Sequence, residues 1–184
     1  MRRPLLWTLA LGFVGAAALW AVAGRQSGPG SLAWRAVDRD LRERFPDVPT
    51  VTTAELAAWL ADPGRTPPVL LDAREPEEFA VSHLPGARRV DPDASAAALA
   101  EALAGVDEDR PVVVYCSVGV RSAGVVRRLA EAGHRDVRNL DGSVFRWANE
   151  GRPLVRDGGP AAEVHPYDAV WGRLLHPDRR ARLD

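Results

Sequence analysis

The chain has 184 residues, with 24 lysines plus arginines and 25 aspartates plus glutamates, so its formal net charge is −1. This balance, without a basic stripe among aromatic residues, argues against a nucleic acid partner. One cysteine excludes an intramolecular disulfide, and the length suits one folded domain with appendages. His165 and His176 lack metal-ligand spacing, so neither a metal nor another cofactor is expected.

The first 24 residues contain an uncharged run from Pro4 to Gly24. A run of about twenty apolar residues is long enough to cross a bilayer. Arg2 and Arg3 precede the run, and Ala21-Val22-Ala23 resembles a cleavage site. Residues 1–24 are therefore either a cleaved signal or a transmembrane anchor. In either case we expect a membrane-anchored or secreted protein, with membrane contact through residues 4–24 and an extracytoplasmic domain.

Residues 25–47 are expected to form a tether and an amphipathic helix. Residues 25–30 combine glycine and serine with few apolar side chains, as flexible linkers do. Between Ser31 and Phe45, apolar residues recur at helical spacing among arginines and aspartates, and Pro46 ends the pattern. Such a helix either lies on a membrane, packs on the domain or connects the two in solvent. The many charged positions favour the solvated connection.

We expect the folded domain to span residues 48–156. Thr52 and Glu55 form a capping box at the start of its first helix. Later patterns predict strands over residues 69–71, 111–115 and 137–140, the last at a sheet edge, and helices over 77–81, 94–104, 122–132 and 142–150. Trp147 is expected in the core. This alternation is typical of an α/β fold with a mostly parallel sheet.

Residues 157–184 form a C-terminal extension. Its apolar residues between 164 and 175 indicate a short helix folded back on the domain. The arginines at 179–182 are expected to be a solvated end, with contact to anionic lipid as the alternative.

The sole cysteine, Cys116, lies between the strand over 111–115 and the following helix. Ligands bind at this carboxyl edge in open α/β sheets. Gly119 lets the loop curl so that backbone N–H groups turn inward, while the helix N-terminus and Arg121 add positive charge. These features favour a thiolate. A buried cysteine that fills the core is the alternative interpretation, but the loop chemistry favours a nucleophile.

Several segments resemble the signatures of one family, the single-domain rhodaneses, which are sulfurtransferases. Cys116-Ser117-Val118-Gly119-Val120-Arg121-Ser122 resembles their active loop, and Leu71-Asp72-Ala73-Arg74 resembles their early Asp-x-Arg signature. His83-Leu84-Pro85-Gly86-Ala87 resembles the His-Ile-Pro-Gly-Ala signature. Asp141-Gly142-Ser143 with Trp147, Gly151 and Pro153 resembles the closing motif. The resemblance covers residues 50–156. It implies a three-layer α/β domain with a central, mostly parallel sheet and helices on both faces.

The resemblance also implies an activity and a set of site residues. Cys116 would carry a sulfane sulfur as a persulfide, from thiosulfate, a polysulfide or a persulfide to a small thiol, cyanide or a protein acceptor. Arg121 would share the catalytic role. Asp72 would hold the active loop, and Arg74 would line the pocket. The residues expected to bind substrate within the loop are Ser117, Val118, Gly119, Val120 and Ser122.

Other functions remain open at the level of the sequence. Phosphatases of similar architecture have a loop one residue longer than the four residues between Cys116 and Arg121, which disfavours phosphate hydrolysis. The loop carries no basic residue at 117, 118 or 120, so thiosulfate is expected to be a poor donor. The main alternative is a membrane-tethered sulfur-carrier or sulfide-sensing module with little turnover.

Overall fold

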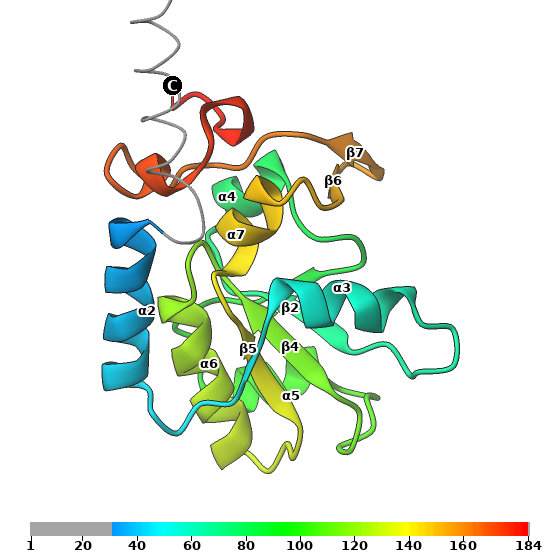
Figure 1. Ribbon diagram of the computed structural model, residues 1–184. Coiled ribbons are helices and arrows are strands. Elements are labelled where there is room, and N and C mark those ends of the chain that lie inside the picture. The colour runs from blue at the N-terminus through cyan, green and yellow to red at the C-terminus, as the bar shows by residue number, and fades with distance from the viewer. Residues whose placement is uncertain (1–30, 184) are drawn as a thin grey trace, which may run out of the picture.

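A five-stranded sheet forms the centre of the protein, whose residues 31–183 are described by a computed structural model (Figure 1). The strand order is β1-β5-β4-β2-β3, and every neighbouring pair in this sheet is parallel. The strand bounds are β1 Thr50–Val51, β2 Val69–Asp72, β3 Arg88–Arg89, β4 Val112–Tyr115 and β5 Val137–Leu140. All residues of β2 and β4 are buried, as expected for inner strands covered on both faces.

Helices cover both faces of the sheet, which confirms the predicted three-layer α/β architecture. Side chains alternate across each strand, so Val113 faces one hydrophobic core with α3 and α7, while Val112 and Val114 face a second core with α5 and α6. The helix bounds are α3 Thr53–Ala61, α4 Pro76–Val81, α5 Ala96–Ala102, α6 Val120–Glu131 and α7 Ser143–Asn149.

Most predicted elements are present, with differences at their ends and at one sheet edge. The capping box forms between Thr52 and Glu55 as predicted. The strand β5 is not at the sheet edge, because Thr50 of β1 pairs with Asn139. A strand of two residues is too short to give a periodic pattern, so the sequence did not indicate it.

Helix α2, Leu32–Arg44, packs on the domain, so the solvated connection expected from the sequence is wrong. Trp34 is fully buried in the core that also contains α3 and α7. Asp38 accepts a hydrogen bond from Arg146 of α7 at 2.9 Å. Ser31 caps the helix by accepting from the Trp34 backbone N–H.

The C-terminal extension also folds back onto the domain (Figure 1). A hairpin of β6 Leu154–Arg156 and β7 Gly159–Ala161 spans the start of the extension, and two short 3-10 helices follow, η1 Trp171–Leu174 and η2 Pro177–Arg179. Leu175 is fully buried in the core, as predicted for a folded-back segment. The backbones of Val164 and Arg180 form an isolated parallel β-bridge, so the final arginines do not form a wholly solvated end.

Within residues 31–183 no helix has the length and apolar character needed to cross a bilayer. The predicted signal or anchor over residues 1–24 lies outside the described residues.

Candidate active site

Cys116 lies where the inner strand β4 ends, and its loop curls back over the sulfur. The side chain is buried, with 1% of its surface exposed. The Gly119 N–H donates a hydrogen bond to Cys116 Sγ at 3.1 Å. Gly119 has φ +115°, which a residue with a Cβ adopts only with strain. A Cβ there would also lie 3.1 Å from Leu41 Cδ1 of α2. Glycine is therefore needed both for the curl and for the close approach of α2.

The surroundings of Cys116 favour its ionised form. Burial raises the pKa of the thiol, but the charge of Arg121 and hydrogen bonds from Ser122 and Gly119 lower it by more. The net result is a thiol pKa below its ordinary value. Deprotonated sulfur is the nucleophilic form, so the site is suited to attack on an electrophilic atom.

Arg121, at the start of α6, is held by a carboxylate from α4. Its guanidinium donates to Glu78 through Nη1 at 2.7 Å and Nη2 at 2.9 Å, and to Ser117 Oγ at 2.9 Å. Glu78 also accepts from Ser117 Oγ at 2.8 Å. Burial raises the pKa of Glu78, but its bonds and proximity to Arg121 lower it by more. A partly buried ion pair therefore fixes the loop between Cys116 and Arg121.

The sequence did not identify Glu78 as part of this site. Glu78 pairs with Arg121, which lies 43 residues further along the chain. Glu75 lies 3.8 Å from Arg121. A glutamate on a helix that follows the strand β2 was the available signal, but its partner depends on how α4 packs against α6.

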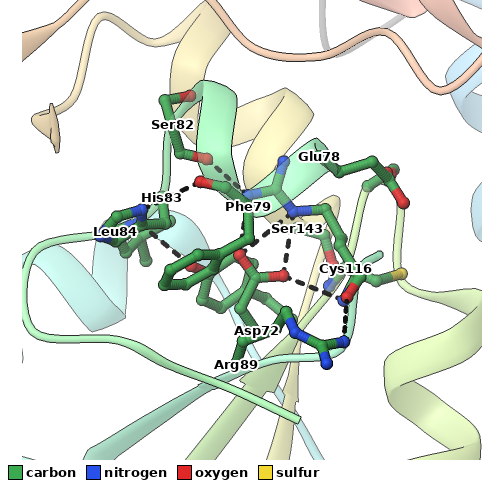
Figure 2. A network of polar contacts seen from close by, with 12 residues as sticks. Asp72, Glu78, Phe79, Ser82, His83, Leu84, Arg89, Cys116 and Ser143 are labelled. Carbon is green, nitrogen blue, oxygen red and sulfur yellow. Dashed lines mark hydrogen bonds and ion pairs between the residues drawn. The ribbon is translucent and has the colours of Figure 1, made fainter. Parts of the chain in front are cut away.

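Side chains and amides from β5 and α7 hold the rest of the loop. Ser143 Oγ accepts from the Cys116 N–H at 3.2 Å. Figure 2 labels both residues. The amide N–H groups at the start of α7 donate to the Cys116 and Ser117 carbonyls at 3.1 Å. Asn139 donates to the Gly119 carbonyl at 3.0 Å and accepts from Ser122 Oγ at 2.7 Å. Ser122 is thus a buried support of the loop, and Asn139 is a partner that the sequence did not single out.

Asp72 and Arg74 lie together at the end of β2, but not at the cysteine loop. Arg74 is fully buried and donates to both carboxylate oxygens of Asp72, at 2.9 Å and 2.7 Å. It also donates to the Ser82 carbonyl at the end of α4, at 2.6 Å. In Figure 2 the sulfur of Cys116 points away from Asp72. Arg74 is not among the residues that line the pocket at Cys116, and the carboxylate of Asp72 bonds to Arg74. A role of Asp72 in holding the loop stays a prediction.

A pocket of about 210 Å³ opens above Cys116. Its floor consists of predicted loop residues, and its outer walls come from α2 and the C-terminal extension. The lining residues besides Cys116 are Asp40, Arg44, Ser117, Val118, Val120, Arg121, Tyr167 and Trp171. The sequence did not predict that segments flanking the domain complete the pocket. In the part of the chain from 31 to 183, no group of three histidine, cysteine or acidic side chains is placed to hold a metal ion.

Comparison with known proteins points to one family for this domain. Residues 52–150 match the model of a protein family that is described as "Rhodanese-like domain". A probable adenylyltransferase/sulfurtransferase, MoeZ of Mycobacterium tuberculosis, is 38% identical over 104 residues, which are 56% of this chain and 26% of that protein. The chain thus spans about a quarter of that relative. A sulfurtransferase of Allochromatium vinosum is 34% identical over 91 residues, which are 50% of this chain and 81% of that protein.

Solved structures show the same fold. The crystal structure of a thiosulfate sulfurtransferase from Pseudomonas aeruginosa superposes with a TM-score of 0.55 and 26% sequence identity. The similarity covers 67% of this chain and 23% of that one.

Proposed function

This chain belongs to the rhodanese-like domain family, and on that premise we propose that it is a sulfurtransferase that works through a persulfide on Cys116. The observation that carries the proposal is the hydrogen bond of 3.1 Å from the Gly119 N–H to Cys116 Sγ, at the base of a pocket. A fixed donor aimed at the sulfur stabilises negative charge there without reorganisation during the reaction. The sulfurtransferase names of relatives from Mycobacterium tuberculosis and Allochromatium vinosum support the same chemistry.

The proposed reaction has two displacements. In the first, the Cys116 thiolate attacks the outer sulfur of a donor, a new S–S bond forms, and the donor's S–S bond breaks with its electron pair on the leaving group. In the second, a thiol or cyanide attacks the outer sulfur of the persulfide, and the electron pair returns to Cys116. Donors of the required kind are thiosulfate, polysulfides and persulfides. Neither step needs an oxidant or a metal.

Arg121 has a proposed electrostatic role in both steps. Its charge lowers the pKa of Cys116 and favours the thiolate before attack. Its contacts with Ser117 and Glu78 keep the loop in the conformation that presents the Gly119 N–H. We propose that Ser117, Val118 and Val120 contact the substrate, since all three line the pocket.

Steady-state kinetics with a sulfane-sulfur donor and cyanide tests this function. Wild-type protein should give parallel lines in double-reciprocal plots, because the donor product leaves before cyanide reacts. The variant Cys116→Ala should have no activity, and its circular dichroism should match that of the wild type. Since Cys116 is the sole cysteine, no other thiol can substitute for it. Turnover retained in Cys116→Ala would refute the proposal.

The enclosure of Cys116 favours a second candidate, a sulfur carrier or sulfide sensor with little turnover. The side chain has 1% exposure beneath walls supplied by α2 and the C-terminal extension. A carrier would take up one sulfur per chain but release it slowly to cyanide and small thiols. Release measured after a single loading separates the two candidates, since an enzyme releases the sulfur at its steady-state rate.

We propose from the sequence that residues 4–24 direct the protein to or across a membrane. Fractionation of cells that express the full chain, with the mass of the mature protein, distinguishes an anchor from a cleaved signal. Recovery of the uncleaved chain in the cytosol would contradict both.

A further inference from the structure

The pocket above Cys116 has an apolar side that the proposed reaction does not require. Val118 and Val120 lie on the loop, and Tyr167 and Trp171 come from the C-terminal extension. Both aromatic residues lie outside the matched residues 52–150. An aromatic wall of this kind contributes apolar contact area with little loss of side-chain freedom.

The turn that carries the two rings is tightly fixed. Asp168 Oδ1 accepts from the N–H groups of Val170 and Trp171 at 2.7 Å and 2.8 Å. The backbone of Tyr167 has φ +67°, and its N–H donates to His165 Nδ1 at 3.1 Å. Trp171 is partly buried and packs against the core. The aromatic wall is therefore built into the fold, although 48% of Tyr167 is exposed.

The cations of the pocket are matched by carboxylates. Arg121 is paired with Glu78, whose side chain is 2% exposed, and lies 5.0 Å from the centre of the Tyr167 ring. Arg44 is paired with Asp40 at 3.2 Å. A dianionic donor would enter a pocket whose positive charges are already engaged, and would be desolvated by the aromatic wall. A donor with one negative charge and an apolar group fits these surroundings better.

On the basis of the proposed sulfurtransferase function, we infer that Tyr167 and Trp171 select monoanionic organic sulfur donors with an apolar substituent over dianionic thiosulfate. The donor has the form R–S–S⁻ or R–SO₂–S⁻. The Cys116 thiolate attacks its terminal sulfur, and the donor's S–S bond breaks with the electron pair on R–S⁻ or on the sulfinate R–SO₂⁻. One negative charge stays on the Cys116 persulfide and one leaves, so the step balances without another reactant. The apolar group R lies against the aromatic wall.

Three donors with a common reacting sulfur separate charge from apolar contact. Methanethiosulfonate differs from thiosulfate mainly in charge, and benzenethiosulfonate differs from methanethiosulfonate in its ring. Wild-type kcat/KM should rise from thiosulfate to methanethiosulfonate to benzenethiosulfonate. The ratio of two kcat/KM values does not depend on the fraction of active protein, so partly misfolded variants remain informative.

Variants on the two sides of the pocket test each contribution. Trp171→Ala and Tyr167→Ala should lower the ratio of benzenethiosulfonate to methanethiosulfonate by about tenfold, the usual effect of losing an apolar contact in a pocket. Tyr167→Phe keeps the ring and should keep the ratio. Val170→Ala is the matched control, since Val170 is 68% exposed and does not line the pocket. Glu78→Gln frees the charge of Arg121 and should shift preference from methanethiosulfonate towards thiosulfate.

Two results would overturn the inference while leaving the sulfurtransferase function intact. One is a wild-type preference for thiosulfate over both thiosulfonates. The other is an unchanged donor ratio in both aromatic variants. Absence of turnover and of sulfur uptake with all three donors and with polysulfide would instead contradict the proposed function itself, and the donor inference with it.

Discussion

Replacement of Glu78 by glutamine tests the ion pair that holds the cysteine loop. Each Glu78 oxygen accepts two hydrogen bonds, Oε1 from Arg121 and Ser117 and Oε2 from Arg121 and the Glu75 N–H. A glutamine keeps one carbonyl oxygen and turns an NH₂ group towards the other two donors. Two bonds and the negative charge are therefore lost whichever way the amide is oriented.

The expected cost follows from the burial of the pair. Breaking a buried ion pair costs about 3–5 kcal/mol, and a hydrogen bond to a charged group contributes about 1.5–3 kcal/mol. The Arg121 side chain is 23% exposed, so water can replace part of the interaction that Arg121 loses. We expect Glu78→Gln to lose about 3 kcal/mol of unfolding free energy, at the lower end of that range.

Urea denaturation at neutral pH measures this loss. Glu77→Gln is the matched control, because it makes the same chemical change at an exposed position of α4 and should change stability by less than about 0.5 kcal/mol. The pKa of Glu78 lies below its ordinary value, so its stabilisation is present above the unfolded-state pKa and is lost as pH falls through the folded one. The difference in unfolding free energy between the wild type and Glu78→Gln should therefore become smaller in acid. A loss within about 1 kcal/mol of the control would refute a stabilising role for this pair.

Three further variants test separate parts of the structure. Trp34→Ala should lower the unfolding free energy measured with denaturant by about 3–5 kcal/mol, because the side chain is fully buried. A negligible loss would mean that α2 does not pack on the domain. Gly119→Ala should cost about 1–3 kcal/mol from backbone strain at φ +115° and should slow persulfide formation in stopped flow; wild-type values for both would contradict the loop geometry. Arg121→Gln removes a charge that lowers the pKa of Cys116, so thiolate absorbance should appear at higher pH than in the wild type, and an unchanged titration would exclude this electrostatic role.

The sequence predicted the features that depend on local order along the chain. Apolar residues at 112–115 specify a buried strand, and the residues after it place Cys116 at the strand's carboxyl end. Gly119 marked the point where the loop curls, which its positive φ confirms. The capping of α3 by Thr52 and Glu55 involves residues three apart, so the sequence alone was sufficient to predict it.

The features missed by the sequence depend on packing between distant segments. Arg74 pairs with Asp72, two residues away, whereas Glu78 of α4 binds Arg121, which is 43 residues away. Helix α2 has the charge pattern of a solvated helix, yet its single buried residue, Trp34, fills a gap in the core. Aromatic residues in the C-terminal extension gave no periodic signal that would place them over the cysteine.

Sulfur transfer by this protein requires that Cys116 can carry a sulfur atom, and intact-protein mass spectrometry measures this capacity directly. The protein is incubated with an excess of sulfane-sulfur donor, and small molecules are then removed. Its mass should increase by that of one sulfur atom, which peptide mapping should locate at Cys116. Cyanide should remove that mass and yield thiocyanate. A chain that stays unmodified with thiosulfate, polysulfide and benzenethiosulfonate, while its thiol still reacts with an alkylating reagent, would contradict the account.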